Sequence, residues 1–157
     1  MRERAPLGAT LPRSRDTARA ISQGDARVEE NFEVVRRCLA TFESDPEAWL
    51  ETLDPALEWY PEEERHDLIR GREGAQRARE RWMETFKEGS HRYEIEELAG
   101  QGENVFSGIC EYAEGAGSGI EIESRIYHHW KIRNGKVAYI YEATDRSEAL
   151  EAAGLSE

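Results

Sequence analysis

Ionisable and aromatic side chains are concentrated on both sides of Asn134–Gly135, near the end of the chain. Asn-Gly between two alternating runs predicts a two-residue hairpin, because both turn residues need positive φ. Pairing outward from such a turn places Tyr127 opposite Glu142. Arg125 and His129 then share their face. A carboxylate beside a phenol and an imidazole can move a proton and polarise an oxygen. We therefore take Glu142, Tyr127 and His129 as candidate catalytic residues.

The other face of the predicted hairpin is aromatic and apolar, with Trp130 opposite Tyr139 and His128 opposite Tyr141. His128 and His129 are adjacent in a strand, so they point to opposite faces and cannot bind one metal ion together. No other His or Cys stands at ligand spacing. We therefore expect no metal site, and we expect no cofactor.

Composition excludes several classes of function. The 157 residues suit one domain, and the formal charge of −12 makes nucleic acid a poor partner. Membrane spans need about 20 apolar residues in a row, and we find no such window. Two Cys, Cys38 and Cys110, are too few for a disulfide framework. We expect reduced thiols in a cytoplasmic protein that binds neither nucleic acid nor membrane.

The first 27 residues differ from the rest, with six Arg against three acidic residues and no periodic apolar stripe. We expect residues 1–27 to form a flexible basic leader and residues 28–157 to form the domain. Helices are expected from Val28 onward, briefly after Pro46, and over 71–89, where Gly89 would end the helix. Residues 61–70 are expected to be a charged loop.

The second half of the chain is typical of antiparallel sheet. Gly-rich or Asn-Gly turns separate four alternating runs, and a strand is also expected before the long helix. The predicted strands are 56–60, 91–98, 105–113, 120–132 and 137–143, and a short helix at 146–153 closes the chain. Helices first and strands afterwards favour an α+β fold, with helices packed on one face of a curved sheet.

The order of these elements and several local sequences resemble the nuclear transport factor 2-like superfamily, in its SnoaL-like branch. The segments that carry the resemblance are NFEVVRRCLATF, LDPALEW, IRGREG, YHHWKIRNGKV and DRSEALEAAGL, within about residues 28–154. The resemblance implies a cone, in which a strongly bent antiparallel sheet wraps around three helices and a central pocket. It also implies a homodimer that pairs through the sheet. Trp130, His128 and Tyr139 would lie near that interface if their face of the sheet points outward. If that face packs on the helices instead, the polar face of the hairpin would form the interface.

The resemblance also bears on the candidate site. YEATDR is similar to the segment of limonene epoxide hydrolase that carries a catalytic carboxylate, and Glu142 falls at that position. The Arg and Asp that complete that enzyme's triad have no match in SGICEYAEG, where only Glu111 is nearby. SnoaL cyclases move protons with a single acidic residue, a scheme that this chain meets more easily. As ligand-binding residues we predict Trp59, Trp82, Glu111, Arg125 and Ile140.

Three functions remain open on this basis. The protein could be a small enzyme for proton transfer, hydration or hydrolysis on a small hydrophobic metabolite. It could bind such a metabolite without catalysis, or it could be a dimeric interaction module with a vestigial pocket. An enzyme needs at least two convergent titratable groups in the pocket, whereas a binding protein needs an apolar cavity with a few polar anchors.

Overall fold

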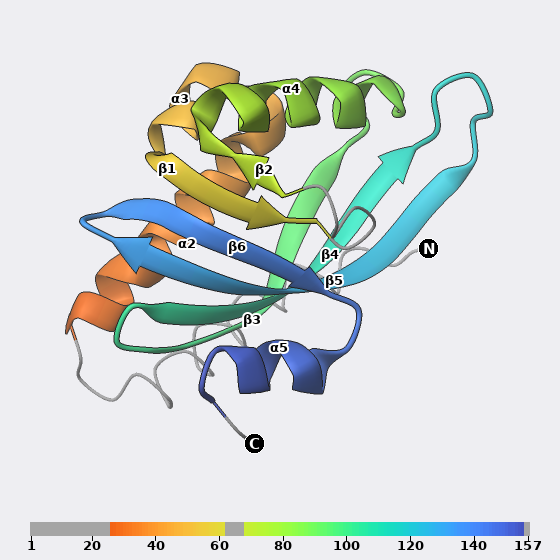
Figure 1. Cartoon of the computed structure of the whole chain (residues 1–157). Helices are drawn as coiled ribbons and strands as arrows, with labels where there is room; N and C mark the ends of the chain where they lie inside the picture. The colour runs from red at the N-terminus through yellow and green to blue at the C-terminus, as the bar shows by residue number, and fades with distance from the viewer. Residues whose placement is uncertain (1–25, 62–67, 156–157) are drawn as a thin grey trace.

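The computed structural model describes residues 26–61 and 68–155 and shows a curled sheet with helices on both of its faces (Figure 1). Asp45 caps the second helix by accepting a hydrogen bond from the backbone N–H of Ala48, as its place before Pro46 predicts. The described elements are α2 (Ala26–Ser44), α3 (Pro46–Glu51), β1 (Leu53–Tyr60), β2 (Ile69–Arg70), α4 (Gly71–Glu84), β3 (Arg92–Gln101), β4 (Asn104–Glu114), β5 (Glu121–Arg133), β6 (Lys136–Ala143) and α5 (Arg146–Ala152).

The six strands of the described sheet follow the order β2-β1-β6-β5-β4-β3. The α+β class and the bent sheet around helices are confirmed, with two differences in detail. Strand β1 pairs in parallel with β6, whereas the other neighbours are antiparallel. Strand β2 lies at the end of the predicted charged loop, and α4 ends at Glu84, before the predicted Gly89. Residues 1–25 of the predicted leader lie outside the described residues.

The register of the β5–β6 hairpin differs from a regular ladder. Asn134 and Gly135 have φ values of 52° and 73°, as the predicted turn requires, and Ile132 pairs with Val137. The next pair joins Lys131 to Tyr139, so Ala138 is an extra residue in β6. This bulge moves the rest of β6 by one position. The predicted pairing of Tyr127 with Glu142 is therefore wrong.

Two apolar clusters occupy opposite faces of the sheet. The inner face packs against α2 and α3 through a core that includes Phe32, Trp49 and Trp130. The outer face carries a smaller cluster in which α5 covers Phe106 and Ala143. Because side chains alternate along a strand, each residue of β4, β5 and β6 belongs to one of these two environments. No helix in the described part of the chain is long and apolar enough to cross a membrane.

Helix α4 runs across the open side of the curled sheet and is fixed at both ends (Figure 1). At its start, Gly71 has a φ of 71°, and Nε of Arg72 donates to the carbonyl of Leu53. Beyond its end, the backbone N–H of Lys87 donates to the carbonyl of Glu114, and that of Ala116 donates to Thr85. The helix is thereby held above the inner face, which leaves a space between them.

Candidate functional site

A cavity of about 600 Å³ lies between α4, β1 and the inner face of the sheet. Its wall is largely aromatic, because β1, α2, β3 and α4 each contribute a ring to it. Two carboxylates and an imidazole of the neighbouring strands β4, β5 and β6 reach the same space, and Arg125 of β5 lies at its edge. The aromatic residues are Phe42, Trp59, Trp82 and Tyr93, and the carboxylates and the imidazole are those of Glu111, Glu142 and His128.

Glu142 lies near the end of β6 and is held by neighbours on both sides. Nε1 of Trp59, on β1, donates a hydrogen bond to Oε2 of Glu142 over 2.9 Å. His128, its partner in the ladder, has Nε2 3.8 Å from the same oxygen. The Glu142 side chain keeps 20% of its surface exposed, against 4% for Glu111. Glu142 is therefore the more accessible of the two cavity carboxylates.

His128 is oriented by a short chain of polar groups behind the cavity wall. Nε1 of Trp130 donates to Oγ of Ser107 over 2.8 Å, and Oγ lies 3.4 Å from Nδ1 of His128. Because Ser107 accepts from the indole, its own hydroxyl proton is available to Nδ1. This arrangement suits the tautomer of His128 that carries its proton on Nε2, the atom that faces Glu142.

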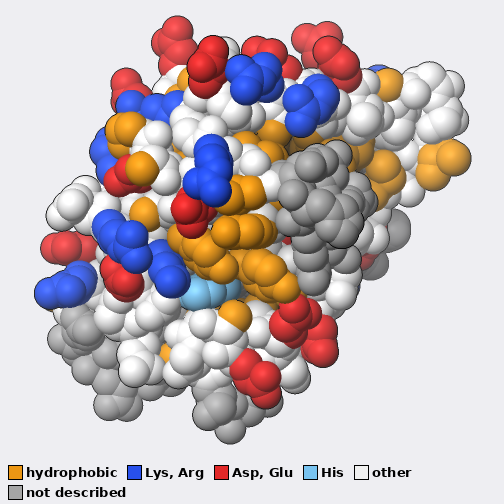
Figure 2. Space-filling view, in the orientation of Figure 1, with side chains coloured by type: hydrophobic (Ala, Val, Ile, Leu, Met, Phe, Trp, Pro, Cys, Tyr) orange, Lys and Arg blue, Asp and Glu red, His pale blue; other side chains and the backbone are white. Residues whose placement is uncertain are grey.

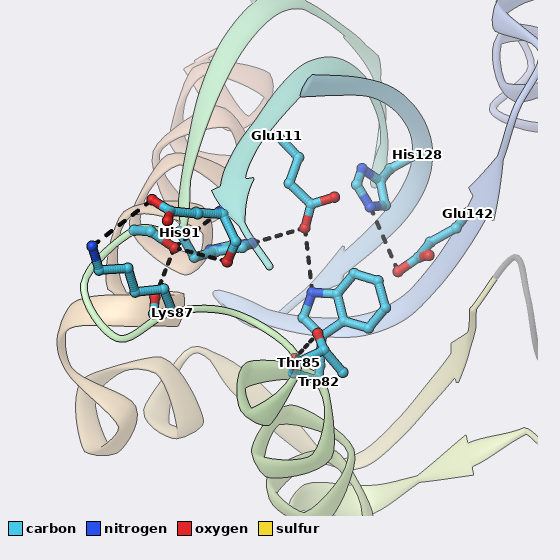
Figure 3. A network of polar contacts seen from close by, with 9 residues as sticks. Trp82, Thr85, Lys87, His91, Glu111, His128 and Glu142 are labelled. Atoms are coloured by element: carbon cyan, nitrogen blue, oxygen red, sulfur yellow. Dashed lines mark hydrogen bonds and ion pairs between the residues drawn. The ribbon is translucent and has the colours of Figure 1, made fainter. Parts of the chain in front are cut away.

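Glu111 is the centre of a second, deeper group (Figure 3). Its Oε2 accepts from Nε1 of Trp82 over 3.3 Å and lies 2.8 Å from Nε2 of His91. Glu111 and His91 are buried, and both lie under the end of α4. Each cavity carboxylate thus has one indole donor and one imidazole neighbour, although the two groups come from different elements. Trp59, Glu142 and His128 all line the cavity, whereas in the second group Trp82 and Glu111 line it and His91 lies behind Glu111.

Tyr93 contributes a phenol to the same space. It pairs with Glu111 across the β3–β4 ladder, so its side chain lies on the inner face. Burial raises the pKa of Tyr93 well above its ordinary value, and the negative charges of Glu111 and Glu142 raise that pKa further. The phenol therefore remains protonated at neutral pH and can donate a hydrogen bond.

Comparison with known proteins places the chain in a family. The model of the SnoaL-like domain matches residues 34–140. The chain belongs to the SnoaL-like domain family.

Solved structures with a similar fold include several SnoaL-like proteins and relatives. A SnoaL-like polyketide cyclase from Jannaschia sp. CCS1 is 18% identical, with a TM-score of 0.63, and the match covers 82% of this chain and 94% of that one. TerC, co-crystallised with polyporic acid, is 22% identical with a TM-score of 0.64 over 79% of this chain and 97% of its own.

A protein with a ketosteroid isomerase-like fold from Catenulispora acidiphila, in complex with trimethylamine, is 15% identical with a TM-score of 0.62 over 78% and 93% of the two chains. At sequence identities of 15–22%, the similarity to these structures shows the fold of the chain alone. A comparison with curated proteins finds no match to the chain.

The SnoaL-like fold divides the predicted catalytic residues between two faces. Glu142 lines the cavity, whereas Tyr127 and His129 lie on the outer face. Tyr127 packs with Phe106 beside α5, and Nε2 of His129 donates to Oδ1 of Asn104 over 2.8 Å. The bulge at Ala138 causes the separation, because it pairs Glu142 with His128 instead.

The predicted ligand-binding residues lie closer together. Trp59, Trp82 and Glu111 line the cavity. Arg125 is at its edge, but its guanidinium forms a two-pronged ion pair with Glu96, with both N–O distances 2.8 Å. Ile140 lines a small adjoining pocket instead. In the described part of the chain, no group of three or more His, Cys, Asp or Glu side chains is placed to hold a metal ion.

Three polar residues of the site were not among the predicted site residues: His91, Tyr93 and His128. Pairing outward from Asn134–Gly135 places His128 on the same face as Trp130, which is the face that lines the cavity. The sequence predicts that face to be apolar, so His128 is not among the predicted site residues. For Tyr93, alternation along the strand would have linked it to Glu111 only once the β3–β4 register was known. The bulge at Glu96 in that ladder leaves no sequence signal comparable to Asn-Gly.

Proposed function

We propose that the protein binds a small, largely apolar metabolite in the cavity and moves a proton to or from it through Glu142. One observation carries the proposal: two carboxylates, an imidazole and a protonated phenol converge on one aromatic cavity. Convergent titratable groups are what an enzyme needs beyond a binding pocket. The co-crystal of TerC with polyporic acid supports a ligand-binding role for a cavity in this fold.

In the proposed reaction, Glu142 removes a proton from a carbon next to a carbonyl group. The electron pair of that C–H bond moves to the carbonyl oxygen, where Tyr93 donates a hydrogen bond to the developing charge. His128 stabilises the Glu142 carboxylate before transfer, because its Nε2 proton faces Oε2. Return of the proton to carbon or oxygen completes an isomerisation or exchange without any other reactant.

The test uses a simple ketone, because proton removal can be observed without the natural substrate. We expect the protein to accelerate deuterium uptake from D₂O into 2-tetralone, followed by proton NMR. Glu142→Gln keeps the shape of the side chain and removes the base, so the rate should fall about a hundredfold to ten-thousandfold. Binding of the ketone, measured by tryptophan fluorescence, should change little.

The control is Glu151→Gln, which makes the same charge change on the exposed surface of α5. It should leave the exchange rate unchanged. Full exchange activity in Glu142→Gln would contradict the role of Glu142. Binding of ketones without any acceleration by the wild-type protein would instead support the non-catalytic binding function.

We also infer a reducing compartment, such as the cytoplasm, for this protein. Cys38 and Cys110 are both buried free thiols on different elements. Burial raises the pKa of the Cys38 thiol to about 11, which keeps it protonated and unreactive. Labelling with a thiol reagent should therefore be slow in the native protein and rapid after unfolding.

A further inference from the structure

Glu111 has one carboxylate oxygen that its protein neighbours leave unused. The side chain is 4% exposed, and within residues 26–61 and 68–155 both of its hydrogen bonds reach Oε2. In that same part of the chain no hydrogen bond reaches Oε1, which points away from Trp82 and His91 (Figure 3). Because Glu111 lines the cavity and no donor of the described residues reaches Oε1, this oxygen is available to accept from a bound group.

Two side chains contact Oε2 of Glu111, the indole of Trp82 and the imidazole of His91. The Trp82 indole is neutral. Nδ1 of His91 is buried and has no hydrogen-bond partner among the described residues, and the rings of Phe42, Phe86 and Tyr93 surround it. Nε2 is thus the ring nitrogen of His91 through which it contacts Glu111.

No Lys or Arg of the described chain lies within ion-pair distance of Glu111. Arg125, at the edge of the cavity, is already paired with Glu96. Arg81 also reaches the cavity, but it is exposed to solvent, where its charge is screened. Among the described residues, no Lys or Arg side chain therefore pairs with Glu111, and its one ionisable hydrogen-bond partner is His91.

The surroundings of Oε1 select the kind of cation that fits. The faces of aromatic rings attract ammonium groups, and Trp is the strongest of these rings. Trp59, Trp82, Phe42 and Tyr93 all line the cavity. Divalent metal ions need six or more oxygen ligands or a compact ligand set, which these aromatic walls do not supply. An organic ammonium with an apolar body satisfies the carboxylate and the rings together.

We propose that the ligand is an organic amine, bound with its protonated nitrogen at Oε1 of Glu111 and its apolar part against the tryptophans. This inference rests on the proposed ligand-binding function and adds the chemical class of the ligand. It gives the two carboxylates different tasks. The deeply buried Glu111 anchors the cation, and the more accessible Glu142 exchanges the proton.

The test compares two probes that differ at one group, phenethylammonium and phenethyl alcohol, by calorimetric titration at pH 7.5. We expect the wild-type protein to bind the ammonium probe at least about tenfold more tightly, since hydrogen bonds to charged groups and cation–π contacts are the stronger ones. Glu111→Gln should bring the two affinities to within about twofold to threefold of each other, chiefly by weakening the ammonium probe.

The control Glu121→Gln removes one charge at an exposed position of β5 and should keep the preference, so general attraction to an acidic protein is separated from the site. Equal affinity of the wild-type protein for both probes would overturn the amine proposal and leave the cavity as a ligand site. This comparison uses only the wild-type protein, so it tests the amine proposal even if Glu111→Gln does not fold. Displacement of the ammonium probe by Mg²⁺ at constant ionic strength would also overturn it.

Failure of both probes and of 2-tetralone to bind would instead overturn the proposed function itself. If the ketone binds and exchanges but the ammonium preference is absent, the proton-transfer function stands without an amine ligand. The two proposals therefore fail in different ways.

Discussion

At the scale of single residues, the site depends on which face of the sheet each side chain occupies. Glu142 reaches the cavity in company with His128, because Ala138 shifts the ladder by one position. Of the site residues predicted from the sequence, Glu142, Glu111, Trp59 and Trp82 line the cavity. The sequence was not sufficient to predict the partners of Glu142, because a single bulge inside a regular alternation has no compositional mark and reverses the face of every residue beyond it.

The buried His129 leads to a prediction about how the free energy of unfolding depends on pH. Burial, together with the smaller effect of the positive charge of Lys131, lowers the pKa of His129 from 6.5 to about 4. In the unfolded chain this pKa is about 6.5, so between pH 6.5 and 4 the unfolded state binds more protons than the folded state. The free energy of unfolding should therefore decrease as the pH falls through this range, by up to about 3 kcal/mol from this residue.

Urea unfolding of the wild-type protein and of His129→Gln, at pH 7 and pH 4.5, measures this contribution. Gln retains a donor for Asn104 but does not titrate. Titration of carboxylates changes the stability of both proteins alike, whereas only the wild-type protein has His129 to titrate. The wild-type protein should therefore lose more stability than the variant when the pH falls from 7 to 4.5. Parallel losses in the two proteins would contradict a buried neutral His129.

At the scale of elements, α4 determines whether the cavity exists. Besides its contacts with β1 and β4, Arg79 of α4 donates from Nε to the carbonyl of Phe42 and from Nη2 to that of Glu43, at the end of α2. The helix and five of the six described strands were predicted to within about five residues, because their periodicities and turns are strong local signals, whereas the short β2 falls in the predicted loop. The parallel pairing of β1 with β6 joins segments far apart in sequence and has no such signal.

Two alanines on α4 provide a matched pair of variants. Ala78 lines the cavity, whereas Ala75 is fully buried in the core. Ala78→Met should fill part of the cavity and weaken binding of 2-tetralone, with little loss of stability. Ala75→Met should overpack the core, lower the free energy of unfolding by about 1–3 kcal/mol and keep ligand binding. Thermal unfolding and fluorescence titration measure both effects. The reverse pattern would contradict the position of the cavity.

At the scale of the whole molecule, the outer face of the sheet is available for association. Trp130 and His128, expected near a dimer interface if their face is outward, are buried on the inner face. Apolar side chains gather instead over β1 and β6 (Figure 2). There Tyr60 contacts Tyr139 and Tyr141, with ring centroids 5.6 and 6.4 Å apart. Of the predicted polar face, only the β5 residues such as Tyr127 and His129 point outward, and the bulge in β6 adds Tyr139 and Tyr141 to them.

We expect a homodimer that pairs through this outer face. Light scattering should give about 36 kDa, twice the 18.0 kDa of the chain. Tyr139→Glu places a charge among the tyrosines and should shift the protein towards the monomer, since an unpaired charge is costly in an interface. Ile120→Glu, at an exposed apolar residue outside this group, serves as the control. An 18 kDa species for the wild-type protein at high concentration would contradict the dimer.

The central claim is that the cavity between α4 and the inner face of the sheet is the ligand site. Its walls contain two of the four indole N–H groups of the protein, those of Trp59 and Trp82, which donate to Glu142 and Glu111. A ¹H–¹⁵N NMR titration with 2-tetralone observes all four indoles at once. We predict the largest shifts at Trp59 and Trp82 and smaller ones at Trp49 and Trp130. Unmoved indole signals, with shifts confined to Tyr60, Tyr139 and Tyr141 on the outer face, would contradict the account.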